Sequence, residues 1–115
     1  MTLKRYATGK RMSEMVVHNG VAYLAGQVAA DPSQDVAGQT RQVLAEIDKL
    51  LAEAGSDKTR IIRAEIFLAD MANFGAMNEV WDAWVPQGDT PARATVEARL
   101  AAPQYQVEIV VTAAI

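Results

Sequence analysis

The dipeptide Asn19-Gly20 restricts the fold more than any other feature of this sequence, because it separates two short runs of β-prone residues. Asn and Gly most readily adopt the positive φ angles that a two-residue type I′ turn requires. Residues 14–28, EMVVHNGVAYLAGQV, are therefore predicted to form an antiparallel hairpin. This hairpin supplies the first two strands of the predicted sheet.

Two later segments carry apolar residues at helical spacing. Residues 35–54 begin with an aspartate suited to an N-cap and are followed by Gly55, which favours a helix end. Asp70 is suited to cap a second helix, which Pro86 and Gly88 would end. The apolar residues that fall on one side of this second helix are Phe74, Met77, Trp81 and Trp84. Both helices are predicted to turn one apolar side toward a core.

Three further segments alternate between apolar and other residues, which predicts strands with two unlike faces. They are residues 60–69, residues 92–100 and residues 106–114. In residues 92–100, ARATVEARL, the polar residues are Arg93, Thr95, Glu97 and Arg99, and the apolar residues alternate with them. We expect the apolar residues of each strand to face the helices and the polar ones to face away.

The order hairpin, helix, strand, helix, strand, strand predicts an α+β sandwich with two helices on one face of a mixed sheet. The other face is predicted to carry Arg63, Glu65, Arg93, Thr95, Glu97, Arg99, Gln106, Glu108 and Thr112, together with Val16, Tyr23, Phe67 and Val110. A face this apolar is poorly suited to solvent. We expect a second copy of the chain to cover it, which would create clefts between subunits of a homo-oligomer.

Composition excludes several classes of protein. A chain of 115 residues, half of them hydrophobic and 22% charged, is typical of one globular domain spanning residues 1–115. The absence of cysteine and of an apolar N-terminal segment predicts a cytoplasmic protein, and no apolar run is long enough to span a membrane. A net charge of -3 disfavours a nucleic-acid partner, and a lone histidine gives no support for a metal site.

Three segments resemble the RidA/YjgF family of imine and enamine deaminases, and most closely its short YoaB-like branch. They are VVHNGVAYLAGQV, IFLADMANFGAMNEVWDAW and TPARATVEARLAAPQYQVEIVVTAAI, which together cover nearly the whole chain. The most specific matches are Gly26 with Gln27, Asn78, the Pro91-Ala92-Arg93 triplet and the Val107-Glu108-Ile109 triplet. The resemblance implies a chorismate-mutase-like, or ferredoxin-like, fold with a six-stranded mixed sheet. It also implies a homotrimer with a central β-barrel and three clefts between subunits.

The same resemblance implies a site for a small imine or carboxylate that needs no cofactor. Arg93 would grip the carboxylate of a 2-imino acid, and Glu108 would position the attacking water. A guanidinium suits this task because its planar fork of donors fits a carboxylate and keeps its charge near neutral pH. The substrate-binding residues would be Arg93, Thr95, Ala25, Gly26, Asn78 and Met12.

The chain departs from the best-known family pattern at three places. KRMSEM stands where typical members have a Gly-Pro-Tyr motif, so Met12 or a neighbour would replace the ring that helps to close the cleft. Ala25 replaces the usual serine, and Thr95 stands where cysteine is common. These changes bear on substrate range, whereas Arg93 and Glu108 are retained.

Each of these residues also has a structural interpretation. Arg93 could pair with Glu108 or Glu97 at a subunit boundary, Trp81 is read as core, and Asn78 is expected to bind buried backbone. The function predicted is hydrolysis of small imines or enamines to the keto compound and ammonia. The alternatives are a non-catalytic module that binds small carboxylates in the same cleft, and an endoribonuclease, which the acidic balance disfavours.

Overall fold

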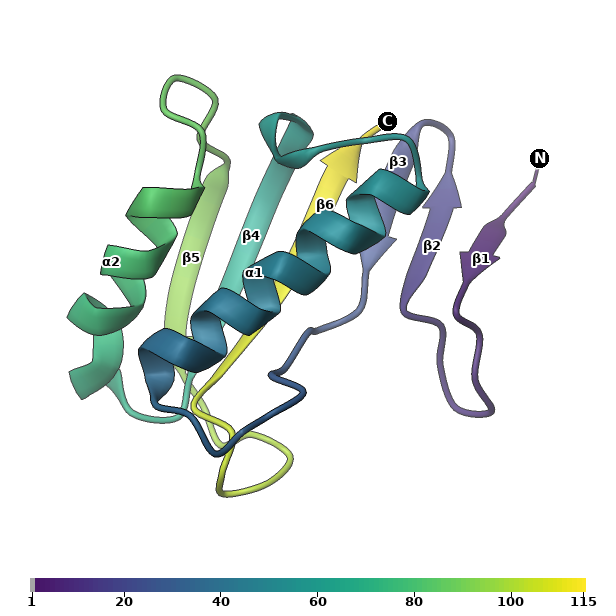
Figure 1. Ribbon diagram of the computed structural model, residues 1–115. Coiled ribbons are helices and arrows are strands. Elements are labelled where there is room, and N and C mark those ends of the chain that lie inside the picture. The colour runs from purple at the N-terminus through teal and green to yellow at the C-terminus, as the bar shows by residue number, and fades with distance from the viewer. Residues whose placement is uncertain (1) are drawn as a thin grey trace.

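The computed structural model describes residues 2–115, which form a six-stranded mixed sheet with two helices on one face (Figure 1). The strands are β1 (Lys4–Tyr6), β2 (Met15–His18), β3 (Val21–Leu24), β4 (Ile61–Leu68), β5 (Ala92–Glu97) and β6 (Val107–Ala114). The helices are α1 (Val36–Glu53) and α2 (Phe74–Trp84). The strand order is β1-β2-β3-β6-β4-β5, and only β4 and β5 pair in parallel. The predicted α+β sandwich is confirmed.

Local signals of the sequence account for the hairpin. Asn19 and Gly20 both have positive φ angles, 50° and 78°, and His18 pairs with Val21 across the turn. A type I′ turn requires positive φ at both central residues, which Asn and Gly tolerate best. The predicted hairpin is confirmed.

Capping residues account for the limits of the helices. The carboxylate of Asp35 accepts a hydrogen bond from the Gly38 amide at 2.9 Å, and α1 ends just before Gly55, whose φ is 77°. Asp70 caps a short 3-10 turn, η2 (Met71–Asn73), that leads directly into α2. Both predicted helices are confirmed, although Asp70 acts one turn earlier than expected.

One strand and one strand limit differ from those expected from the residues alone. Strand β1 pairs with β2, but its three residues are too few to show an alternating pattern. Strand β5 ends at Glu97 and not at Leu100, and the chain then forms a loop up to β6. The residues alone indicated five strands, and only the family resemblance implied the sixth.

The core lies between the helices and one face of the sheet, which we call the covered face. Its buried sheet residues are Met15, Ala22, Leu24, Ile61, Ala64, Ile66, Leu68, Val107, Ile109, Val111 and Ala113. They pack against Val43, Leu44, Ile47, Leu51 and Met77 of the helices. Burial of these side chains supplies the main driving force for folding.

The opposite face, which we call the open face, is not covered by any described element of the chain. Cross-strand pairing places on it Val16, Tyr23, Arg63, Glu65, Phe67, Glu108, Val110 and Thr112. All eight were predicted to lie on this face, but the polar residues of β5 that were predicted beside them do not lie there. Tyr23 is half exposed, at 50%, so a large aromatic ring remains accessible there. The one ion pair within residues 2–115 joins Arg63 and Glu65 on this face.

The predicted orientation of β5 is wrong. Arg93 pairs with Ala64 and Thr95 with Ile66, and paired residues share a face, so the polar residues of β5 lie on the covered face. Its apolar residues lie on the open face, where Val96 is 46% exposed. Alternation identifies two faces but not which of them is buried, and a shift of one residue exchanges them.

The correction extends to Glu97 and Arg99, which were also expected on the face away from the helices. The Glu97 carboxylate instead accepts a hydrogen bond from the Met71 amide at 2.9 Å. Arg99 lies beyond the end of β5 and is exposed. Glu97 therefore holds the start of η2 against the sheet edge.

Candidate functional site

Arg93 is held between strand β5 and helix α2. Its Nη1 donates a hydrogen bond to Asn78 Oδ1 at 2.8 Å. Its Cζ lies 5.3 Å from the ring centroid of Trp81 and 5.9 Å from that of Phe74. All three partners belong to α2, so one helix fixes the guanidinium by an amide and two aromatic rings.

The charge of Arg93 is not neutralised within the described chain. The guanidinium is partly buried, and residues 2–115 contain no carboxylate within ion-pair distance of it. The predicted pairing with Glu108 or Glu97 is therefore not made within one chain. A partly buried cation with neutral partners is an arrangement that favours the binding of an anion.

Thr95 lies two residues along β5 on the same face as Arg93. Its Oγ1 is buried and has no hydrogen-bond partner among the described residues. Alternate residues of a strand are about 6 to 7 Å apart, within reach of a small ligand that also touches Arg93. A buried hydroxyl without a partner carries a desolvation cost that a ligand group can offset.

Glu108 and Gly26 meet at the open face. A Cβ atom added to Gly26 would lie 2.1 Å from Glu108 Oε2, so a side chain at position 26 would displace this carboxylate from its observed position. Gly26 is held close to β6 because Gln27 exchanges two backbone hydrogen bonds with Ile109. Ala25 precedes this pair, and its amide donates to the Glu14 carbonyl.

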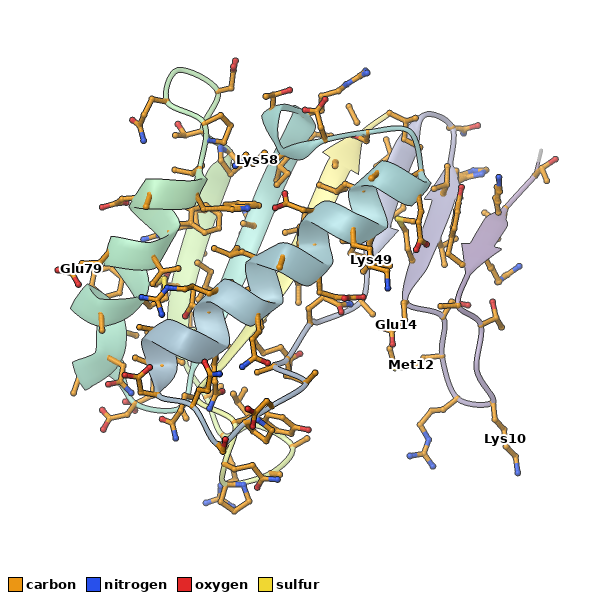
Figure 2. The ribbon with its side chains drawn as sticks, in the orientation of Figure 1. Lys10, Met12, Glu14, Lys49, Lys58 and Glu79 are labelled. Carbon is orange, nitrogen blue, oxygen red and sulfur yellow. The ribbon has the colours of Figure 1, made fainter. Side chains whose placement is uncertain are left out.

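Met12 lies apart from the other candidates. It is 49% exposed on the loop between β1 and β2, beside Glu14 (Figure 2). Strands β1 and β2 form one edge of the sheet and β5 forms the other. Met12 and Arg93 of one chain are therefore at opposite sides of the sheet.

Arg93 and Glu108 are also separated within one chain. Glu108 pairs with Phe67, and Phe67 with Val96, three residues beyond Arg93. Strand spacing and rise place the two residues about 10 Å apart across the sheet and about 10 Å apart along it, on opposite faces. One small molecule cannot contact both side chains of the same chain.

The structure thus brings together two groups of predicted residues. Arg93, Asn78 and Thr95 lie at the covered face, and Gly26 and Glu108 lie at the open face. Asn78 binds the guanidinium and not buried backbone, which corrects the prediction. The sequence interpretation missed the role of Trp81 and Phe74, although Asn78 between them on an apolar helix side was a signal.

Two grooves of the chain are lined by other residues. One, of about 430 Å³, lies between α1 and α2 and includes Arg41, Asp48, Lys58 and Trp84. The other, of about 600 Å³, borders the loop that follows β5. Arg93 and Glu108 line neither of them.

Two exposed carboxyl groups have a lowered pKa, and both lie outside these two groups. Hydrogen bonds from the hydroxyl and amide of Ser33 lower the pKa of Asp31, and those of Thr59 lower the pKa of Asp57. Each carboxylate is thereby engaged in local loop structure.

Within residues 2–115, no helix is both long and apolar enough to cross a membrane. The same stretch of chain holds no group of three or more His, Cys, Asp or Glu side chains arranged to bind a metal ion.

Comparison with known proteins identifies the family. The family model described as Endoribonuclease L-PSP matches residues 2–115. The RutC family protein YoaB of Escherichia coli is 45% identical over 115 residues, which is all of both chains. NMB1025 of Neisseria meningitidis, a member of the YjgF protein family, has a crystal structure that superposes with a TM-score of 0.97. It is 50% identical, with 99% of this chain and 95% of that chain covered.

A more distant relative carries the name of a reaction. The rat protein named 2-iminobutanoate/2-iminopropanoate deaminase is 31% identical over 103 residues, which is 84% of this chain and 74% of the rat protein. Full-length agreement in sequence and fold with these proteins shows that the chain belongs to the RidA/YjgF family, whose members are also named RutC or L-PSP proteins.

Proposed function

We propose that this protein hydrolyses small 2-imino acids, or the enamines in equilibrium with them, to 2-keto acids and ammonia. The observation that carries the proposal is Arg93, a fixed and partly buried guanidinium whose partners are all neutral. Such a group suits the carboxylate of a small acid. The name of the rat relative supports the choice of imine hydrolysis.

The reaction needs few groups. Arg93 would anchor the carboxylate, and Thr95 Oγ1 would hydrogen-bond a second polar atom of the ligand. Water adds to the electrophilic carbon of the C=N bond, with Glu108 orienting it and accepting its proton. That proton passes to nitrogen, which gives a carbinolamine. Its hydroxyl proton then moves to the amino group while the C=O bond forms and the C–N bond breaks, which releases ammonia and the keto acid. The roles of Gly26 and Ala25 would be to admit the ligand beside Glu108.

We further propose that the working unit is a homotrimer whose sites combine residues of two subunits. Arg93 and Glu108 of one chain lie on opposite faces of the sheet, so a shared ligand requires Glu108 from a neighbouring subunit. The apolar residues on the open face, including Tyr23 and Val96, support its burial by other copies of the chain. Met12, at the far edge of the sheet, would likewise reach the site from a neighbour.

The first experiment generates 2-iminopropanoate in a coupled assay and measures its hydrolysis. Arg93→Lys keeps the charge but loses the planar fork, so its kcat/KM should fall at least about tenfold. The kcat/KM of Arg93→Ala should fall further. Ala45→Lys, on exposed helix surface, serves as a control that should hydrolyse the imine at the wild-type rate. Binding of 2-keto acids without any hydrolysis would instead support the non-catalytic carboxylate-binding module.

The second experiment tests the shared site by mixing two inactive variants, Arg93→Ala and Glu108→Gln. In a random one-to-one mixture about three quarters of trimers are mixed, and each has one intact site of three, so about a quarter of wild-type activity should return. Each variant refolded alone provides the control. Activity that stays at the level of the separate variants would refute the two-subunit site.

A further inference from the structure

One side of helix α2 provides every described partner of the Arg93 side chain. Phe74, Asn78 and Trp81 are spaced by four and three residues, so their side chains lie along one stripe of the helix. The two rings lie within 6 Å of the guanidinium carbon, and Asn78 Oδ1 accepts from Nη1. The stripe therefore fixes the position of the guanidinium and the direction of its Nη1 donor.

The partner of Nη1 is an amide where a carboxylate would form a stronger hydrogen bond. A guanidinium has five N–H donors, and in residues 2–115 the bond to Asn78 is its one hydrogen bond. An aspartate at position 78 would make a charge-assisted bond and would neutralise the cation. An asparagine fixes the same nitrogen and leaves the positive charge for another group.

We propose that Asn78 is a positioning residue whose neutrality is its function. It holds the guanidinium in place while keeping both the charge and the remaining donors available for a ligand carboxylate. The inference rests on the proposed function only for the identity of the ligand as a small carboxylate. In this proposal Asn78 acts by holding Arg93 and does not contact the substrate directly.

The proposal and a merely structural role predict opposite effects for one substitution. If Asn78 serves only to connect α2 with β5, then Asn78→Asp should keep or raise both the melting temperature and the affinity for a carboxylate, because a charged acceptor strengthens the hydrogen bond to Arg93. If Asn78 preserves the charge of Arg93, then Asn78→Asp should keep or raise the melting temperature while it weakens carboxylate binding. Stability and affinity must be measured on the same sample.

The experiment titrates wild type and variants with 2-oxobutanoate, the keto acid expected from 2-iminobutanoate, by calorimetry. Asn78→Asp should bind at least tenfold more weakly than wild type. Ala76→Asp adds the same charge at an exposed position of α2 and should change affinity less than twofold. Wild-type affinity in Asn78→Asp would overturn the proposal, as would a wild type that does not bind 2-oxobutanoate.

A second variant covers the case in which Asn78→Asp does not fold. Asn78→Leu has a similar size and no acceptor, so it should weaken binding in the wild-type background. The same change in an Arg93→Lys background should have little further effect, because the two residues act through one contact. Independent, additive losses would overturn the proposal. Absence of imine hydrolysis with these binding results intact would count against the proposed function alone.

Discussion

The two faces of strand β4 share one backbone and differ in what covers them. On the covered face Ala64, Ile66 and Leu68 are completely buried beneath the helices. On the open face Arg63 is exposed, and Glu65 and Phe67 are only partly buried, because the described chain places no element over them. Burial in this sheet is therefore decided by the partner layer, which one face has within the chain and the other lacks.

Strand β5 reverses the usual distribution on both faces. It places a cation and a hydroxyl on the covered face and Val96 on the open face. Among residues 2–115 the cation has neutral partners and the hydroxyl has none, so that part of the chain leaves each available to a ligand. The exposed valine is available to another copy of the chain. These exceptions are the residues that the proposed ligand site and the proposed subunit interface would use.

The largest expected effect concerns the open face as a subunit interface. Wild type should give by light scattering about three times the chain mass of 12.4 kDa. Val96→Glu would bury a carboxylate at the interface at a cost of several kcal/mol, so the trimer should dissociate at micromolar concentration. Ala45→Glu adds the same charge on exposed α1 surface and should leave the mass unchanged. A Val96→Glu protein that keeps the trimer mass would show that this face is not the interface.

The next effect compares two isoleucines of β4. Ile66 is completely buried on the covered face, so Ile66→Ala should lower the free energy of unfolding by about 2–5 kcal/mol. Ile62 is 49% exposed, so Ile62→Ala should lower it by about 1 kcal/mol or less. Denaturant titration measures both. A larger loss for Ile62 would mean that a neighbouring subunit buries it, and a loss below about 1 kcal/mol for Ile66 would contradict the position of the core.

The smallest effect concerns the hydroxyl without a partner on the covered face. Thr95→Val removes it while keeping the shape of the side chain, so stability should stay the same or rise by up to about 1 kcal/mol. Affinity for 2-oxobutanoate should fall by about two- to tenfold, the value of one hydrogen bond. Thermal melting and calorimetry of this variant test both effects. Lower stability with unchanged affinity would make the hydroxyl structural.

Local signals in the sequence predicted the elements well. Asn19-Gly20 fixed the hairpin, Asp35 and Gly55 bounded α1, and helical spacing identified α2, because each of these features acts through the few residues around it. Strand β1 was not predicted from the residues, because three residues show no period and its place depends on pairing with β2. The family resemblance supplied that sixth strand.

The family resemblance named candidate site residues but not how they are arranged. The residues named from the family include Arg93, Asn78 and Glu108, but their grouping follows from strand register and helix placement. Sequence alone read Asn78 as a ligand of backbone, whereas it binds the guanidinium. Trp81 is a core residue, as predicted, and its ring also contacts the guanidinium. Contacts of this kind join positions 12 and 15 residues apart, which no local pattern encodes.

The sequence by itself determined the order of elements, their approximate limits and the family to which the chain belongs. It also determined that β5 has one polar and one apolar side. Only the tertiary structure decided which side of β5 faces the helices, because two faces of an alternating strand are equivalent until another layer covers one of them. That choice places Arg93 under α2 and leaves Glu108 on the other face of the sheet.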